Sequence, residues 1–259
     1  MHLRWPRRPG ACGAEAGVVS CARSVTHLRD ALPRVLVVSL APAADAAKYA
    51  ADPRYRSLVP RGLFITFEGP EGSGKTTQVE LLGSALASRE PVLVREPGGN
   101  ELGERIREIV LYGSMELDAE AEMYLFMAAR RQLIAEVIAP ALAAGQIVVA
   151  DRYHDSTLAY QGGAKGVPTM WPATFPRPDI TFLLSVPVES GLERLARAGN
   201  KPDRMESESI EFHKRVAAAY DQLAAAEPNR FVRLDATGSR EHIHQTVMDR
   251  LRPLLAAAE

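Results

Sequence analysis

Residues 63–76 read LFITFEGPEGSGKT, an apolar run that leads directly into a turn rich in glycine. The turn matches the spacing G-x-x-x-x-G-K-[ST], whose fixed positions are Gly69, Gly74, Lys75 and Thr76. Glycine lets the backbone approach an anion closely, and the N–H groups that follow, with a helix N-terminus, bind phosphate oxygens. A plain turn between a strand and a helix needs no such pattern. The stretch therefore predicts a buried strand, a phosphate-binding loop and a helix that begins near Lys75.

Strand and helix patterns alternate along the rest of the chain from Leu63. Short apolar runs predict strands at 63–68, 92–96, 147–151, 180–186 and 230–235. Helical spacing occupies the intervals at 77–87, 102–111, 119–142, 189–197, 210–226 and 240–255. Such alternation is typical of βαβ units, so we expect an α/β fold with about five parallel strands and helices on both faces of the sheet.

Composition excludes several classes of protein. The formal net charge of −1 argues against a protein that coats nucleic acid or a membrane surface. No apolar run is long enough to cross a bilayer. Both cysteines, Cys12 and Cys21, lie near the N-terminus, which favours a reducing compartment and hence the cytoplasm. The histidines show no zinc spacing.

Residues 1–60 differ from the remainder. They are rich in alanine, proline and arginine, and only VLVVSL at 35–40 resembles a strand. We expect a disordered extension or a start codon placed too early, with a targeting presequence as the alternative. One nucleotide-binding domain is expected at 61–259.

The third predicted strand ends in DRYHDSTLAYQGG at 151–163. Asp151 would lie at the carboxyl edge of the sheet, where ligands of open α/β sheets bind; a helix cap is the alternative. Arg152 presents a forked donor suited to phosphate oxygens. The guanine-reading sequence NKxD does not occur, which weakens a GTPase interpretation.

Six stretches in order carry a more specific signal: FEGPEGSGKTTQ (67–78), REPGG (95–99), LFMAARRQ (125–132), DRYHDSTLAYQGG (151–163), RPDITFLL (177–184) and DRMESES (203–209). With them the chain resembles the thymidylate kinases of the bacterial type over nearly all of residues 62–259. The resemblance implies a P-loop NTPase three-layer sandwich with a short lid. It also implies transfer of the γ-phosphoryl group of ATP to thymidine monophosphate (dTMP) with Mg²⁺, in a homodimer. No nucleic-acid or membrane partner is expected.

The resemblance also assigns site residues. ATP would be bound by the loop Gly69, Pro70, Glu71, Gly72, Ser73, Gly74, Lys75 and Thr76, and the metal by Thr76 and Asp151. The dTMP site would consist of Glu71, Arg95, Pro97, Phe126, Arg130, Arg152, Thr157 and Tyr160. Phe126 would stack on thymine, Arg130 would bond its exocyclic oxygen, and Tyr160 would lie near the sugar. Taken alone, Phe126 is more typical of a core position than of a ligand contact, and only its place in LFMAARR favours the base. Glu71 and Arg95 taken alone also fit solvated turns.

Catalysis is expected to rest on charge neutralisation, with Lys75, Asp151, Arg152 and a lid arginine as the catalytic set. The acceptor phosphate is largely dianionic at neutral pH, so no general base is required. Family members with glycine at the position of Gly72 supply a cation from the lid. Arg197 and Arg204 are the candidates, with Arg204 favoured.

The stretch VPTMWPATFPR at 167–177 departs from the family pattern, because it is shorter and its three prolines exclude most helix. This puts the packing beside the acceptor site in doubt. We interpret His154 as a surface residue. Two alternatives remain open: a kinase for another nucleoside monophosphate or a deoxynucleoside, and a degenerate nucleotide-binding protein without transfer activity.

Overall fold

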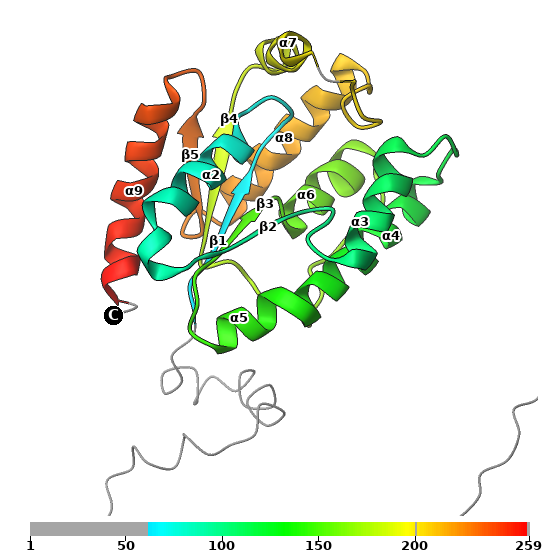
Figure 1. Cartoon of the computed structure of the whole chain (residues 1–259). Helices are drawn as coiled ribbons and strands as arrows, with labels where there is room; N and C mark the ends of the chain where they lie inside the picture. Colours follow the sequence, from blue (N-terminus) through cyan, green and yellow to red (C-terminus); the bar gives the residue numbers. More distant parts are fainter. Residues whose placement is uncertain (1–61, 200, 258–259) are drawn as a thin grey trace, which may run out of the picture. The chain divides into compact units, whose positions relative to one another are not determined.

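A computed structural model describes residues 62–199 and 201–257 of the 259-residue chain. Within these ranges five strands form one sheet in the order β2-β3-β1-β4-β5, and helices cover both of its faces (Figure 1). All four neighbouring pairs are parallel. The strands are β1 (Phe64–Glu68), β2 (Val92–Arg95), β3 (Val148–Asp151), β4 (Ile180–Ser185) and β5 (Phe231–Asp235). The predicted α/β fold with five parallel strands is confirmed.

The predicted helices are all present, and a further helical stretch at 154–164, which the sequence did not predict, follows β3. The helical segments are α2 (Lys75–Ala85), η2 (Ala87–Arg89), α3 (Glu101–Arg107), η3 (Glu108–Tyr112), α4 (Ala119–Leu133), η4 (Ile134–Ile138), α5 (Ala139–Ala143), α6 (His154–Thr157), η5 (Leu158–Ala164), α7 (Val188–Ala198), α8 (Ile210–Ala226) and α9 (Arg240–Ala257). The stretch predicted as one helix at 119–142 passes through a π-helical turn, η4, before α5. Pro140 has no N–H to donate to the preceding turn, which accounts for the altered hydrogen bonding there.

Alternation along the strands places apolar side chains on both faces of the sheet. Ile65 and Phe67 of β1 belong to a core that also contains residues of α2 and α9. Phe64, whose side chain points to the opposite face, belongs to a core with residues of α4, η4 and α5. A third core joins Leu183 to α8 and η5. The sheet is therefore buried on both faces, as its continuous apolar strands predict.

The parallel register brings three chain segments to one edge of the sheet. Phe67 of β1 lies beside Asp151 of β3, and Asp151 lies beside Arg95 of β2. The segments that leave these three strands therefore emerge next to one another at the carboxyl edge. This edge holds the phosphate loop.

The hypotheses for residues 1–60, including the strand at 35–40, fall outside the described residues. In the part of the chain that is described, no helix combines the length and the apolar composition that a membrane crossing requires.

Candidate active site

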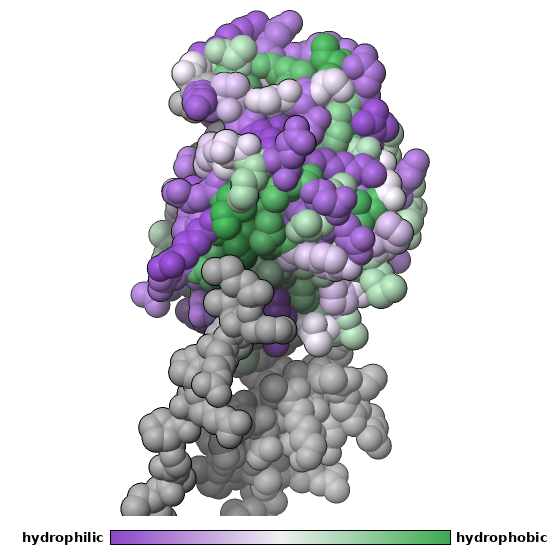
Figure 2. All heavy atoms as spheres, turned by 90° about the vertical axis from the view of Figure 1, so that its right-hand side faces the viewer, coloured by the Kyte–Doolittle hydropathy of each residue, from purple (hydrophilic) through white to green (hydrophobic). Residues whose placement is uncertain are grey.

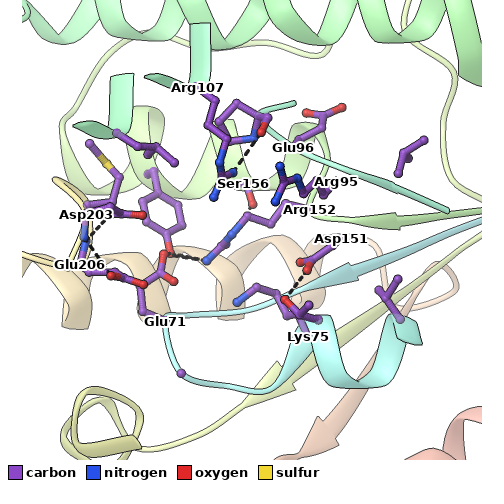
Figure 3. A pocket seen from close by; sticks show the side chains of 18 of the residues that line it. Glu71, Lys75, Arg95, Glu96, Arg107, Asp151, Arg152, Ser156, Asp203 and Glu206 are labelled. Carbon is purple, nitrogen blue, oxygen red and sulfur yellow. Dashed lines mark hydrogen bonds and ion pairs between the residues drawn. The ribbon is translucent and has the colours of Figure 1, made fainter. Parts of the chain in front are cut away.

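A cleft of about 910 Å³ lies at the carboxyl edge of the sheet (Figure 3). Most of the residues that the sequence singles out line it together. They are Glu71, Gly72, Gly74, Lys75, Thr76, Arg95, Pro97, Phe126, Arg130, Asp151, Arg152, Thr157 and Tyr160. These residues come from five stretches of the chain, so the fold assembles them from positions far apart in the sequence.

The phosphate loop is held in shape by Lys75. Its Nζ donates to the Pro70 carbonyl oxygen at 2.8 Å and to the Ser73 Oγ at 3.3 Å, and its side chain is buried. Burial and the neighbouring Arg152 cation lower the pKa of Lys75 to about 8, although nearby carboxylates act in the opposite direction. An anion bound in the loop would replace the carbonyl as the partner of this ammonium group.

The conformation and the packing of the loop allow only glycine at position 72. Its φ is +68°, and a Cβ built there would lie 2.0 Å from the Gly191 carbonyl oxygen of α7. Both the left-handed backbone and the contact with another main chain exclude a side chain. The loop therefore cannot carry an arginine at this position.

Thr76 and Asp151 form a polar pair at the start of α2. The Thr76 hydroxyl of α2 donates to Asp151 Oδ2 at the end of β3 at 2.5 Å. The two side chains offer hard oxygen atoms of the kind that Mg²⁺ prefers. Among the described residues no group of three or more acidic, histidine or cysteine side chains could hold a metal. This set fits an ion that takes most of its ligands from water and phosphate oxygens.

An ion pair between Arg152 and Glu71 occupies the centre of the cleft (Figure 3). The Arg152 guanidinium donates to Glu71 Oε1 at 2.7 Å, and the Tyr160 hydroxyl donates to the same oxygen at 2.7 Å. Burial raises the pKa of the Glu71 carboxyl, but Arg152 and Lys75 outweigh burial and lower it to about 2. Glu71 is therefore a partly buried, ion-paired carboxylate that stays charged, not a solvated side chain.

Glu68, at the end of β1, binds two of the hydroxyl groups that contact Arg152. Its carboxylate is fully buried and accepts from the Tyr153 N–H at 2.8 Å and from the hydroxyls of Ser156 at 2.6 Å and Tyr220 at 2.9 Å. These hydroxyls lie within 3.2 Å of the Arg152 guanidinium as well. The network fixes a residue whose backbone, at φ +69°, adopts the left-handed conformation.

A second buried arginine lies at the other end of the cleft. Arg130 of α4 donates to Glu96 Oε2 at 2.6 Å, to the Thr157 hydroxyl at 2.7 Å and to the Tyr153 carbonyl oxygen at 3.1 Å. Burial raises the pKa of the Glu96 carboxyl to about 7, against the effect of Arg130. Phe126, one turn before Arg130, is partly buried and lines the same end of the cleft.

The interpretation of His154 as a surface residue is wrong. Its side chain is fully buried, with Nδ1 3.2 Å from the Arg130 guanidinium and Nε2 3.0 Å from the Met170 carbonyl oxygen. The imidazole edge packs on Trp171, with ring centroids 4.8 Å apart. Residues 167–177, whose packing the sequence leaves in doubt, are therefore anchored to the site without a helix.

Neither predicted lid arginine lines the cleft. Arg197 is 78% exposed and pairs only with Glu193 on its own helix, among the interactions of the described residues. Arg204 donates to the fully buried Glu122 at 2.6 Å and to the Val110 carbonyl oxygen at 2.9 Å. Glu122 also accepts from Gln161 and Lys165. Arg204 is thus held at the α4 side of the cleft.

The cleft contains residues that sequence reasoning did not assign. They are Glu96, Arg107, Ser156, Gln161, Arg194, Asp203, Met205 and Glu206, among others. Glu96 and Gln161 lie inside the motifs REPGG and AYQGG, so a closer examination of those motifs could have identified them. Arg107 and Arg194 lie within ordinary amphipathic helices and carry no local signal. Arg95 lines the cleft and forms an exposed ion pair with Glu104 at 3.1 Å.

Comparisons with known proteins identify the family. The model of the family "Thymidylate kinase" matches residues 67–247. The thymidylate kinase of Halothermothrix orenii is 45% identical over 207 residues, which cover 75% of this chain and 99% of that protein. That of Pseudomonas fluorescens is 47% identical over 204 residues, which cover 75% and 96%. The crystal structure of thymidylate kinase from Ehrlichia chaffeensis superposes with a TM-score of 0.60 at 31% identity, covering 74% of this chain and 100% of that one. The chain belongs to the thymidylate kinase family.

Proposed function

We propose that the chain transfers the γ-phosphoryl group of ATP to dTMP, giving ADP and thymidine diphosphate, with the residues of the cleft in the roles set out below. Membership of the thymidylate kinase family supports the reaction. The observation that carries the residue roles is that one cleft joins the phosphate loop to a buried arginine site, with the Arg152–Glu71 pair between them.

The triphosphate is bound by the loop at residues 69–76. Lys75 exchanges its internal carbonyl partner for β- and γ-phosphate oxygens, and the N-terminus of α2 adds its dipole. Thr76 and Asp151 hold Mg²⁺. The ion, when bound, neutralises charge between the phosphates.

The acceptor nucleotide occupies the opposite end. Phe126 stacks on the base, and Arg130 offers a donor to the exocyclic oxygen of thymine. Gln161 contributes there too, because its NH₂ group is engaged by Glu122 at 2.9 Å, which leaves its carbonyl oxygen as the acceptor for a base N–H. Tyr160 and Pro97 border the sugar and its surroundings.

The acceptor phosphate lies between the two ends. Arg152 and Arg95 neutralise it; Arg95 is released easily because its pair with Glu104 is exposed. Glu71 orients Arg152 and faces the sugar. Since the attacking oxygen belongs to a phosphate that is already largely ionised, positioning and charge neutralisation suffice for the transfer.

The end of α7 and the lid segment that follows it supply a further cation in the transition state. The exclusion of a side chain at Gly72 supports this role for the lid. Among the described residues Arg197 is held only by an exposed ion pair, whereas Arg204 would first have to leave the buried Glu122. Substituting each by alanine separates them: the residue that acts in the transition state lowers kcat, and the other does not.

The acceptor specificity is tested with Mg²⁺, ATP and the monophosphates of thymine, uracil, adenine and cytosine, with ADP release as the readout. We expect dTMP to be the best acceptor. A different best acceptor would refute the roles of Phe126, Arg130 and Thr157. Nucleotide binding without ADP release would refute the transfer reaction itself.

We further propose a homodimer formed through the α3–α4 side of the molecule. Exposed apolar side chains occur along this segment, including Leu102, Ile109, Tyr112 and Tyr124. Figure 2 views this side and shows an apolar area bordered by polar residues. Sedimentation equilibrium tests the proposal, and a Tyr124→Glu variant should shift the population to monomer. The net charge of −1 supports an enzyme without a nucleic-acid or membrane-surface partner. The cysteine usage supports a cytoplasmic location.

A further inference from the structure

The hydrogen bonds of His154 determine which tautomer its ring adopts. Nε2 lies 3.0 Å from the Met170 carbonyl oxygen, which can only accept. Nδ1 lies 3.2 Å from the Arg130 guanidinium, which can only donate. The ring must therefore carry its proton on Nε2 and offer a bare Nδ1 to Arg130. Burial and the Arg130 cation lower the pKa of His154 to about 3, so this neutral form persists across the physiological range.

The donors of Arg130 are almost fully used within the protein. Its Nε–H is taken by Glu96, and its first NH₂ group lies within reach of Thr157 and His154. The second NH₂ group donates to the Tyr153 carbonyl oxygen. A guanidinium has five N–H groups, so the described residues leave one N–H of the second group for a ligand. The direction of that N–H depends on all the other acceptors.

The 167–177 segment fixes the imidazole. Trp171 and Phe175 both pack edge-on against it, with centroid distances of 4.8 Å and 5.5 Å. Trp171 is held in turn by the Arg177 guanidinium, 4.1 Å above its ring, and donates through Nε1 to the Phe175 carbonyl oxygen at 3.1 Å. His154 thus connects a segment without helix to the arginine of the acceptor site.

We propose that His154 is a positioning residue for base recognition: through Nδ1 it holds Arg130 in the orientation that binds the thymine oxygen. The inference rests on the proposed function, because Arg130 must contact the base. His154 itself does not line the cleft and acts only through Arg130.

A fixed Arg130 would also discriminate between pyrimidines. Thymine presents an acceptor oxygen at C4, whereas cytosine presents an amino group, which is a donor. A guanidinium held in place meets the cytosine amino group donor to donor, and this mismatch disfavours binding. Without the His154 acceptor, the Arg130 guanidinium can adopt other orientations. Its loss of orientation should weaken the binding of thymine and also reduce the discrimination against cytosine.

Three substitutions of His154 separate its two hydrogen bonds. His154→Asn places a carbonyl oxygen near the position of Nδ1 and keeps the acceptor for Arg130. His154→Gln places an amide nitrogen near the position of Nε2 and keeps the donor for Met170. His154→Leu removes both. Steady-state kinetics with dTMP, dCMP and ATP are measured for each variant, and thermal melting reports whether each one folds.

The Gln and Leu variants should raise KM for dTMP about tenfold and lower the preference for dTMP over dCMP by a similar factor, with KM for ATP and kcat within about twofold. The Asn variant should stay within about threefold of the unmodified enzyme in all three quantities. In an Arg130→Ala background, His154→Gln should add no further loss. If both the Asn and the Gln variant melt at an equally lowered temperature, the expected difference between them in KM for dTMP still distinguishes the acceptor role of His154 from a loss of stability.

Failures at different levels are distinguishable. If the unmodified enzyme does not prefer dTMP, or if Arg130→Ala leaves KM for dTMP unchanged, the proposed function or the role of Arg130 fails, and the inference fails with it. If Arg130→Ala raises KM but the Asn and Gln variants behave alike, the inference on His154 alone is overturned. The Asn–Gln pair keeps the test decisive even if the Leu variant does not fold.

Discussion

Replacing Arg152 by methionine should destabilise the protein, because it leaves the Glu71 carboxylate buried without its main partner. The two side chains are only 15% and 16% exposed and lie 2.7 Å apart, so solvent screens them little. Methionine matches the arginine stem in volume but carries no charge. The substitution therefore isolates the electrostatic contribution of the guanidinium.

The magnitude follows from the pKa of Glu71, which is lowered from 4.5 to about 2. At about 1.36 kcal/mol per pKa unit this corresponds to about 3 kcal/mol of stabilisation. Lys75 and Tyr160 supply part of it, so we expect Arg152→Met to lower the free energy of unfolding by about 2–3 kcal/mol at pH 7. Because the folded pKa is depressed, this contribution is complete above pH 4.5 and is lost as the pH falls towards 2.

Urea unfolding followed by circular dichroism at pH 7 and pH 3 measures the effect. Arg105→Met is the matched control, since Arg105 pairs with Glu101 on the helix surface at 75% exposure and should change stability by at most about 0.5 kcal/mol. The double variant with Glu71→Gln completes a cycle. A coupling below about 1 kcal/mol between Arg152 and Glu71, or a loss that does not shrink at pH 3, would refute the reasoning.

Three further predictions concern Lys75 and Glu122. Lys75→Ala should lower kcat at least about 100-fold without unfolding the protein, as a progress curve and a melting curve would show; full activity would contradict the phosphate-loop role. Because the pKa of Lys75 is lowered to about 8, its charge is present below that pH and lost above it. KM for ATP should therefore rise about tenfold from pH 7 to pH 9, and a flat profile would argue against a contact between Lys75 and phosphate. Glu122→Gln removes the anion of Arg204 and leaves Lys165 only its pair with Glu208 at 3.8 Å, so it should cost about 3 kcal/mol in denaturant unfolding. The exposed Glu120→Gln should have little effect, and equal losses would disprove the role of the buried carboxylate.

Local sequence pattern was a sound guide where local geometry governs structure. The strand β1 and the helix that begins at Lys75 follow from the periodicity and from the glycine spacing between them. All five strands lie within two residues of their predicted bounds. The π-helical turn η4 escaped prediction because Pro140 alters the hydrogen bonding without disturbing the apolar spacing on which the prediction rests.

His154 shows where local pattern loses its value. The residue follows a strand and begins a short helix, a position where exposure is common, and nothing beside it in sequence indicates burial. The aromatic side chains that enclose it come from residues 171 and 175, and its acceptor role depends on Arg130 from α4. These contacts exist only after the segments have packed.

The sequence by itself determined the fold class, the phosphate loop and the family, because each depends on spacing along a single stretch or on the order of motifs. Only the tertiary structure decided that Gly72 faces the main chain of α7, that Arg204 is held by Glu122 and that His154 contacts Arg130. Each of these contacts joins residues more than 20 positions apart. Their geometry depends on how helices settle on the two faces of the sheet, which no local spacing encodes.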